Sequence, residues 1–254
     1  MQIIDIHRFK GVKWSFTTRI VDLGRARTII VDADHVPAAG EIALAVVDTV
    51  GHHKAVESVD GRRSAIFPGD EILLAYGNRY APDQFEAYVP DALGPCHLAA
   101  GGGIAANVVA LHGRVRPPTD ITVTGVLGDS HGRALNLAEF ALPARNPRGS
   151  APVICVCGTS MNAGKTSSMA VLVRGLTRAG HRVGPMKATG TGAGNDLRIM
   201  RDSGAIAVLD FTDAGFATTF RSPPDAIEAG ARHLRRRRFD GRHRRRAPSR
   251  RPRI

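Results

Sequence analysis

The sequence predicts an α/β protein in which a mostly β N-terminal domain precedes a domain built on a parallel sheet. Runs rich in β-branched residues, separated by turn signals, fill residues 1–142. From residue 153 the order changes to strand, loop and helix, which is typical of parallel strands joined by crossover helices. Between the two, the polar, proline-rich stretch "PARNPRGSAP" predicts a linker over residues 143–152. We therefore expect the second domain to cover residues 153–234.

The composition is that of a globular protein, and it predicts a cytoplasmic one without a membrane partner. No apolar run approaches the roughly 18 residues of a membrane helix, and the start "MQIIDIHRFK" lacks the apolar core of a signal peptide. The three cysteines, Cys96, Cys155 and Cys157, form no disulfide framework, which is typical of a reducing compartment.

The net charge of +12 is concentrated at the C-terminal end. Residues 231–254 hold twelve arginines and one aspartate, which leaves 23 basic and 22 acidic side chains in the other 230 residues. A nearly neutral body argues against nucleic-acid binding by a whole domain surface. An RNA- or DNA-binding protein that acts through its arginine-rich tail, residues 235–254, stays open as an alternative.

In the first domain, strands are expected in "EIALAVVDTV" and "KAVESV", with turns at Asp60-Gly61 and Pro68-Gly69. "GGGIAANVVALHG" predicts a glycine-rich entry into a short helix. "ITVTGVLGDSHGRALNLAEFAL" predicts two strands around a turn at residues 128–133.

Two further groups in this domain invite more than one interpretation. His52-His53 is predicted to lie in a solvated loop, because adjacent histidines rarely bind one metal without further partners. All three tyrosines and Phe85 fall in "YGNRYAPDQFEAYVP". This cluster predicts either a plug of the first domain's core or a substrate pocket at the domain junction.

In the second domain, "PVICVC" is expected to form the first strand, with Cys155 and Cys157 on one buried face. "KTSSMAVLVRGLTRAG" has apolar residues at helical spacing and ends at Gly180, so it predicts a helix. A second strand is expected in "HRVGPMKATG", a helix in "NDLRIMRDSGA" and a third strand in "AIAVLDF". The last helix, in "SPPDAIEAGARHL", is expected to begin with Ser222 as its cap and Pro223 in its first turn.

The loop "GTSMNAGKTSS", residues 158–168, lies between the first of these strands and the first helix, which is the context of a phosphate-binding loop. Such loops bind anions because consecutive backbone N–H groups point inward at the positive end of a helix dipole. The lysine reaches the phosphate oxygens, and the hydroxyl after it binds Mg²⁺. We therefore expect ATP or another nucleoside triphosphate here. The nucleotide contacts are assigned to Gly158, Thr159, Asn162, Ala163, Gly164, Lys165, Thr166 and Ser167.

Magnesium needs hard oxygen ligands, which predicts Thr166, Asp196 and Asp210 as its ligands. Asp210 ends the apolar run "AIAVLD", where a metal-binding carboxylate would stand, and Asp196 follows a glycine-rich stretch. Each aspartate also fits the role of an ordinary helix cap or turn residue.

The first glycine of the loop stands one residue earlier than in the strict phosphate-loop pattern. In this, "GTSMNAGKT" resembles the loop of dethiobiotin synthetase and its relatives among amide ligases and cofactor-biosynthesis proteins. "RAGHRVGPMKATGTG" resembles the second strand of that group, whose lysine faces the phosphates or the substrate. The resemblance implies a catalytic role for Lys187 beside Lys165, with a surface lysine at a strand end as the alternative. "GHRVGPMK" is also similar to the molybdopterin-guanine dinucleotide biosynthesis protein B.

Both domains together resemble a two-domain P-loop family related to D-glutamate N-acetyltransferase. The segments that carry the resemblance are "HLAAGGGIA", "VTGVLGDSHGRALNL" and the loop, within residues 71–230. The family's loop carries Asp-Cys where this chain has Ser160-Met161. The resemblance implies a P-loop NTPase-type parallel sheet and a Mg²⁺-dependent ligase or N-acyltransferase acting on a small amine or carboxylate. Acetyl-CoA is then an alternative ligand of the loop, and a nucleotide-gated cofactor-delivery protein without turnover is an alternative function.

The second domain is predicted to be incomplete. Residues 152–234 offer about three strand–helix units at ~30 residues each, where a fold of this kind needs about five strands. The abrupt change to arginine-rich sequence suggests a frameshift near Arg235, with a true arginine-rich arm as the alternative. The frameshift hypothesis predicts an exposed sheet edge and unburied apolar faces in the second domain.

Overall fold

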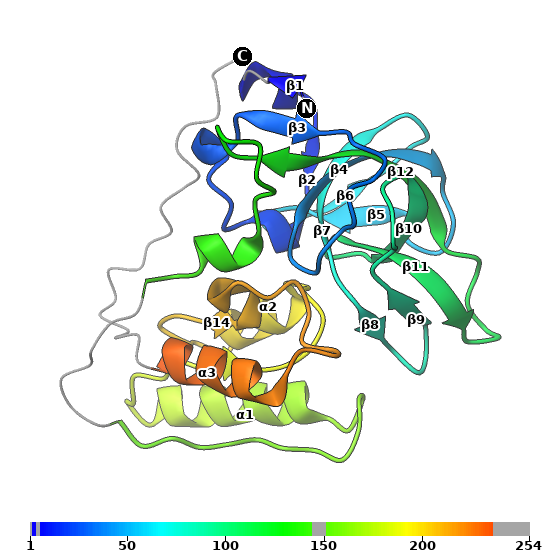
Figure 1. Cartoon of the computed structure of the whole chain (residues 1–254). Helices are drawn as coiled ribbons and strands as arrows, with labels where there is room; N and C mark the ends of the chain where they lie inside the picture. Colours follow the sequence, from blue (N-terminus) through cyan, green and yellow to red (C-terminus); the bar gives the residue numbers. More distant parts are fainter. Residues whose placement is uncertain (1, 4–5, 144–150, 236–254) are drawn as a thin grey trace.

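The computed structural model describes residues 2–3, 6–143 and 151–235 (Figure 1). It is a mixed α/β structure in which one large sheet dominates the N-terminal part and helices flank two short strands in the C-terminal part. Among the described helices, none combines the length and the apolar character that crossing a membrane requires. The predicted linker and tail lie largely outside the described residues, at 144–150 and 236–254.

Strands are the main regular structure of the N-terminal part, as the sequence predicts. They are β1 (Gln2–Ile3), β2 (Lys13–Trp14), β3 (Thr28–Ile30), β4 (Ile42–Thr49), β5 (Ala55–Glu57), β6 (Arg63–Ala65), β7 (Glu71–Tyr76), β8 (Arg79–Tyr80), β9 (Phe85–Tyr88), β10 (Pro95–Ala100), β11 (Ile104–Leu111) and β12 (Thr119–Gly128). The main sheet runs β1-β3-β12-β4-β7-β11-β9-β8, with β10 and β2 paired beside this path. β5 and β6 form a separate hairpin around the expected turn at Asp60-Gly61. Short 3-10 turns η1 (Ile6–Phe9), η2 (Phe16–Thr18), η3 (Leu23–Arg25) and η4 (Leu137–Phe140) complete this part.

The central strands are buried on both faces. Along β4, Ile42 and Leu44 face one hydrophobic cluster, whereas Ala43 and Val47 face another on the opposite side of the sheet. β7 alternates in the same way. Because successive side chains of a strand point to opposite faces, these near-continuous apolar runs serve two cores at once.

Three predictions in this part need correction. "GGGIAANVVALHG" forms strand β11 rather than a helix, because its backbone pairs with β7, β9 and β10. The second strand expected after the turn at residues 128–133 is reduced to two isolated bridges, Gly128 with Ala134 and Glu41 with Asn136. His53 is also buried rather than solvated. Its ring packs edge-to-face against Phe85, and burial lowers its pKa to about 3.

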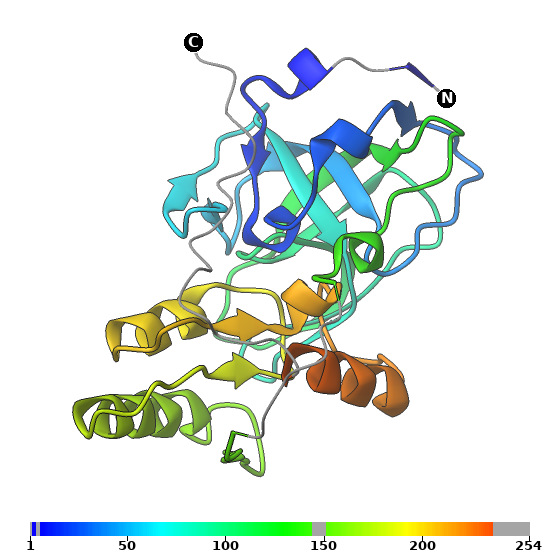
Figure 2. The same cartoon turned by 90° about the vertical axis from the view of Figure 1, so that its left-hand side faces the viewer.

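The C-terminal part forms three layers. β13 (Met186–Lys187) and β14 (Leu209–Asp210) pair in parallel, with α1 (Lys165–Arg178) and α2 (Asn195–Asp202) on one side and α3 (Pro224–Arg235) on the other (Figure 2). The 3-10 turn η5 (Phe211–Ala214) follows β14. The stop at Gly180 is confirmed: Gly180 N donates to Thr177 O and His181 N to Leu176 O, the paired bonds of a Schellman motif.

The start of α3 differs slightly from the prediction. The helix begins at Pro224, and the Ser222 hydroxyl donates to the carbonyl of Thr218 instead of capping the helix. The parallel pairing found in residues 151–235 is limited to β13 and β14.

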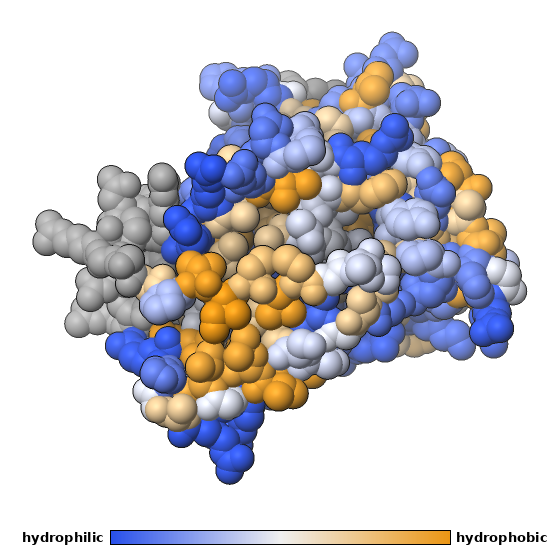
Figure 3. Space-filling model, turned by 90° about the horizontal axis from the view of Figure 1, so that it is seen from below, coloured by the Kyte–Doolittle hydropathy of each residue, from blue (hydrophilic) through white to orange (hydrophobic). Residues whose placement is uncertain are grey.

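The predicted first strand of this part is wrong. Residues 151–157 form no strand, Val153 and Ile154 are 64% and 55% exposed, and both cysteines lie at the surface with their sulfurs 3.3 Å apart. A strand forms only where a neighbour accepts its backbone hydrogen bonds, and no described strand pairs with this segment. Seen from below, the C-terminal part shows a broad apolar surface (Figure 3), in agreement with the expected unburied apolar faces.

The accessibility of the cysteines is directly testable. A thiol reagent such as dithionitrobenzoate is expected to label Cys155 and Cys157 rapidly in the native protein, and Cys96 only after unfolding, because burial raises the pKa of the Cys96 thiol to about 12. The readout is the number of thiols that react before and after addition of guanidinium chloride. Slow reaction of all three thiols would show instead that residues 151–157 are buried.

Candidate functional site

The loop before α1 turns sharply. Asn162 and Gly164 both have left-handed backbone conformations, with φ of 60° and 79°. Gly164 is the N-cap of α1 and provides no side-chain cap, so the first N–H groups of the helix stay available to a ligand. A left-handed asparagine is uncommon outside turns and functional loops.

A cavity of about 300 Å³ lies at this helix end, lined by Asn162, Gly164, Lys165, Thr166 and Ser167. The Lys165 ammonium folds back over the loop and donates to the carbonyl of Ser160. A Cβ at Gly158 would come within 2.9 Å of the Lys165 side chain, so glycine is needed there. Five of the eight predicted nucleotide contacts therefore line one cavity, and Gly158 supports it. Thr159 and Ala163 do not line it.

Three of the predicted catalytic and metal residues meet beside this cavity. The Thr166 hydroxyl donates to Asp196 Oδ1 at 3.2 Å, and Lys187 forms an ion pair with Asp196 Oδ2. They come from three consecutive elements, α1, β13 and α2. The side chains of Lys187 and Asp196 are each only 22% exposed, so Lys187 is not a free surface lysine.

Asp210, the third predicted metal ligand, has different partners. Its Cα is paired with that of Lys187 in the β13–β14 ladder, but its Oδ1 accepts from Arg19 at 2.6 Å. Arg19 also reaches Asp213 at 3.0 Å. Asp210 Oδ2 is buried and has no hydrogen-bond partner among the described residues. Hydrogen bonds therefore join Thr166 and Lys187 to Asp196, whereas Asp210 is joined to the N-terminal part.

The charges of Arg19, Asp210 and Asp213 influence one another. Burial raises the pKa of Asp213, and the neighbouring Asp210 charge acts in the same direction against the opposing effect of Arg19. Burial disfavours the charged form of Arg19, but the two carboxylates outweigh it and raise the pKa of the guanidinium. Arg19 was not identified from the sequence, because its partners are more than 190 residues away.

Contacts from the N-terminal part also fix α2. Glu57 accepts from the backbone N of Gly194 at 2.6 Å and forms an ion pair with Arg198. Phe16 packs into a cluster with Leu197 and Met200 on the same helix. Contacts with the N-terminal part therefore hold the helix that carries Asp196 in place.

The described residues offer no group of three or more His, Cys, Asp or Glu side chains arranged to hold a metal ion. A magnesium ion at the loop would thus depend on Thr166 and Asp196, with the remaining ligands from water and phosphate oxygens. Asp210, paired with Lys187 in the β13–β14 ladder, has an Oδ2 without a hydrogen-bond partner among the described residues.

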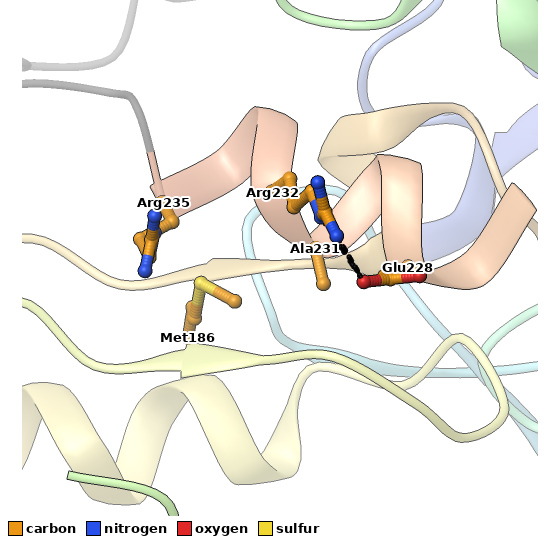
Figure 4. A pocket seen from close by; sticks show the side chains of 5 residues that line it. All are labelled: Met186, Glu228, Ala231, Arg232 and Arg235. Atoms are coloured by element: carbon orange, nitrogen blue, oxygen red, sulfur yellow. Dashed lines mark hydrogen bonds and ion pairs between the residues drawn. The ribbon is translucent and has the colours of Figure 1, made fainter. Parts of the chain in front are cut away.

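A larger cavity, of about 430 Å³, lies between β13 and α3 and is lined by Met186, Glu228, Ala231, Arg232 and Arg235 (Figure 4). Glu228 and Arg232 pair with one another along α3. None of the predicted site residues faces this cavity. The smaller cavity is the better candidate, because the uncapped start of α1, Lys165 and Thr166 line it, and Thr166 is hydrogen-bonded to Asp196.

The aromatic cluster is divided between two roles. Tyr76 and Phe85 are fully buried in the core, whereas Tyr80 and Tyr88 lie at the junction of the two parts, against Phe220. The interpretation as a core plug therefore holds for Tyr76 and Phe85, and the interpretation as a substrate pocket stays a prediction for Tyr80 and Tyr88.

Comparisons with protein-family models, with curated proteins and with solved structures found no match for this chain.

The role of Arg19 can be measured by urea unfolding. Arg19→Met is expected to lower the free energy of unfolding by about 3–5 kcal/mol, because it leaves two carboxylates without their counter-charge. Arg25→Met is the matched control, since Arg25 pairs with Glu139 at the surface, and its effect is expected to stay within about 1 kcal/mol. Equal losses in both variants would contradict the role assigned to Arg19.

Proposed function

We propose that this chain binds ATP or another nucleoside triphosphate with Mg²⁺ at residues 158–167, and that it is a ligase or N-acyltransferase-type enzyme for a small amine or carboxylate. The observation that carries the proposal is the meeting of Thr166, Lys187 and Asp196 beside the loop cavity. A structural role alone would not require a lysine, a carboxylate and a hydroxyl at the mouth of a helix N-terminus.

The loop supplies the phosphate contacts. The N–H groups at the start of α1 are uncapped by any side chain, and the helix dipole favours an anion there. Lys165 now donates to the carbonyl of Ser160, and it would exchange this contact for phosphate oxygens. Its ammonium would then neutralise charge that develops on the transferred group.

The oxygens available suit magnesium. Thr166 and Asp196 would hold the ion, and the unpartnered Oδ2 keeps Asp210 in the proposed ligand set. When bound, Mg²⁺ would supply charge neutralisation at the phosphate oxygens. Once Asp196 ligates a cation, Lys187 is free to turn its ammonium toward the phosphate or the carboxylate of the substrate.

The order of loop, α1, β13, α2 and β14, with its parallel pairing, supports a P-loop NTPase-type domain preceded by a β domain. The resemblance to the D-glutamate N-acetyltransferase-related family favours acyl transfer, in which case the loop would hold the phosphates of acetyl-CoA. Binding of ATP, GTP and acetyl-CoA, each with and without Mg²⁺, distinguishes these ligands.

The loop assignment is tested by substitution. Lys165→Ala is expected to weaken ATP binding at least tenfold, because hydrogen bonds to charged groups contribute about 1.5–3 kcal/mol each. Thr166→Ala is expected to weaken only the part of binding that depends on Mg²⁺. Calorimetry measures both, with circular dichroism to verify the fold. Exposed Lys54→Ala serves as the control, and equal affinity of wild type and Lys165→Ala would refute the nucleotide site.

A nucleotide-gated cofactor-delivery protein is the second candidate, favoured by the contacts that Glu57 and Arg19 make with the C-terminal part. Such contacts would transmit a change at the loop to the β domain. If the chain is an enzyme, a particular amine or carboxylate should stimulate nucleotide consumption, measured as phosphate release. Stimulation by a protein partner alone would favour the delivery role.

A further inference from the structure

Three aromatic rings form a shelf at the junction of the two parts. We call Tyr80, Tyr88 and Phe220 the aromatic shelf. The Tyr80 and Phe220 rings are stacked with centroids 5.7 Å apart and 29° between their planes, and the Tyr88 ring lies 6.3 Å from Phe220. Tyr80 is 47% exposed, so part of its ring surface is open to a ligand.

The shelf lies next to the phosphate loop. Tyr80 ends β8, and Asp83 stands in the turn that leads to β9. The Asn162 side chain of the loop donates to Asp83 Oδ2 at 3.3 Å, and Asn162 also lines the loop cavity. In Figure 1 the β8–β9 hairpin and the chain before α3 approach the loop from above. The cavity for phosphates and the shelf are therefore neighbours.

The hairpin that carries Tyr80 is rigidly held. The preceding residue, Arg79, is buried and donates to the carbonyl of Ala99 and to Gln84 Oε1. Phe85 at the start of β9 is fully buried. A ring on such a support is pre-positioned, which reduces the entropy lost when a ligand stacks on it.

Arg221 adds a positive charge to the shelf. Its backbone is left-handed, with φ of 62°, a conformation that is uncommon for this residue type and concentrated at functional sites. Its guanidinium lies 5.0 Å from the centre of the Tyr88 ring. Among the described residues no carboxylate forms an ion pair with it.

We infer that the aromatic shelf binds the base of the nucleotide whose phosphates the loop holds. The inference rests on the proposed function. A purine base is flat and apolar on its faces, and stacking on an aromatic side chain contributes roughly 1–3 kcal/mol per base. Arg221 would contact the base or the ribose by its planar guanidinium. The shelf thus makes the N-terminal part a contributor to nucleotide recognition.

The test separates the base from the phosphates. Calorimetry with ATP and with inorganic tripolyphosphate is carried out on the full chain. Tyr80→Ala is expected to weaken ATP binding at least fivefold and to leave tripolyphosphate affinity unchanged. Tyr80→Phe, which keeps the ring, is the matched control and should bind ATP as the wild type does.

A second variant gives a positive signal that does not depend on loss of affinity. In Tyr80→Trp, ATP should quench the fluorescence of the new indole, whereas tripolyphosphate should not. The inference is overturned if Tyr80→Ala binds ATP as tightly as the wild type, or if it loses ATP and tripolyphosphate equally. If the wild type binds ATP no more tightly than tripolyphosphate, the loop assignment stands and the shelf inference fails. If the wild type binds neither, the proposed function fails and this inference with it.

Discussion

The placement of the C-terminal part depends on one buried charge. Arg19, only 11% exposed, reaches from the β domain to Asp210 and Asp213 and lies over the ring of Phe16. Removing three charged groups from water is costly, so this arrangement is stable only while each retains its partners. Because Asp210 ends β14, Arg19 fixes the position of that strand and, through the ladder, of Lys187 in β13.

The two strands of the C-terminal part could not form a stable sheet by themselves. Each has two residues, and an isolated pair of strands is marginal in water. The N-terminal part stabilises the neighbouring helix α2: Phe16 packs against Leu197 and Met200, and Glu57 holds the N-terminal end of the helix. The β domain is therefore part of the site, because it determines where Asp196 lies.

The proposed site therefore has two parts that differ in burial. The loop at residues 158–164 is exposed, and under the proposed function Lys165 would exchange its contact with the Ser160 carbonyl for the ligand. The Thr166–Asp196–Lys187 cluster is half-buried and already assembled. In the proposed function, the exposed loop would hold the phosphates beside this assembled polar cluster, and the contacts with the N-terminal part would let nucleotide binding influence it.

The sequence by itself determined the local features. The loop before Lys165, the helix ending at Gly180, the turn at Asp60-Gly61 and the β character of the first domain follow from short-range preferences of glycine, proline and β-branched residues. It also identified Thr166 and Asp196 as candidates, because their residue types suit metal chemistry, whereas the resemblance to the dethiobiotin synthetase group implied a role for Lys187.

Only the tertiary structure decided the rest. "GGGIAANVVALHG" became a strand and "PVICVC" did not, since a short apolar run is ambiguous until its pairing partners are known. His53 became a buried, neutral histidine because distant strands cover it. Arg19 acquired its role from two aspartates that lie near the other end of the chain. Pairing, burial and ion pairs across such separations arise only when the chain has folded, because they depend on which segments the core brings together.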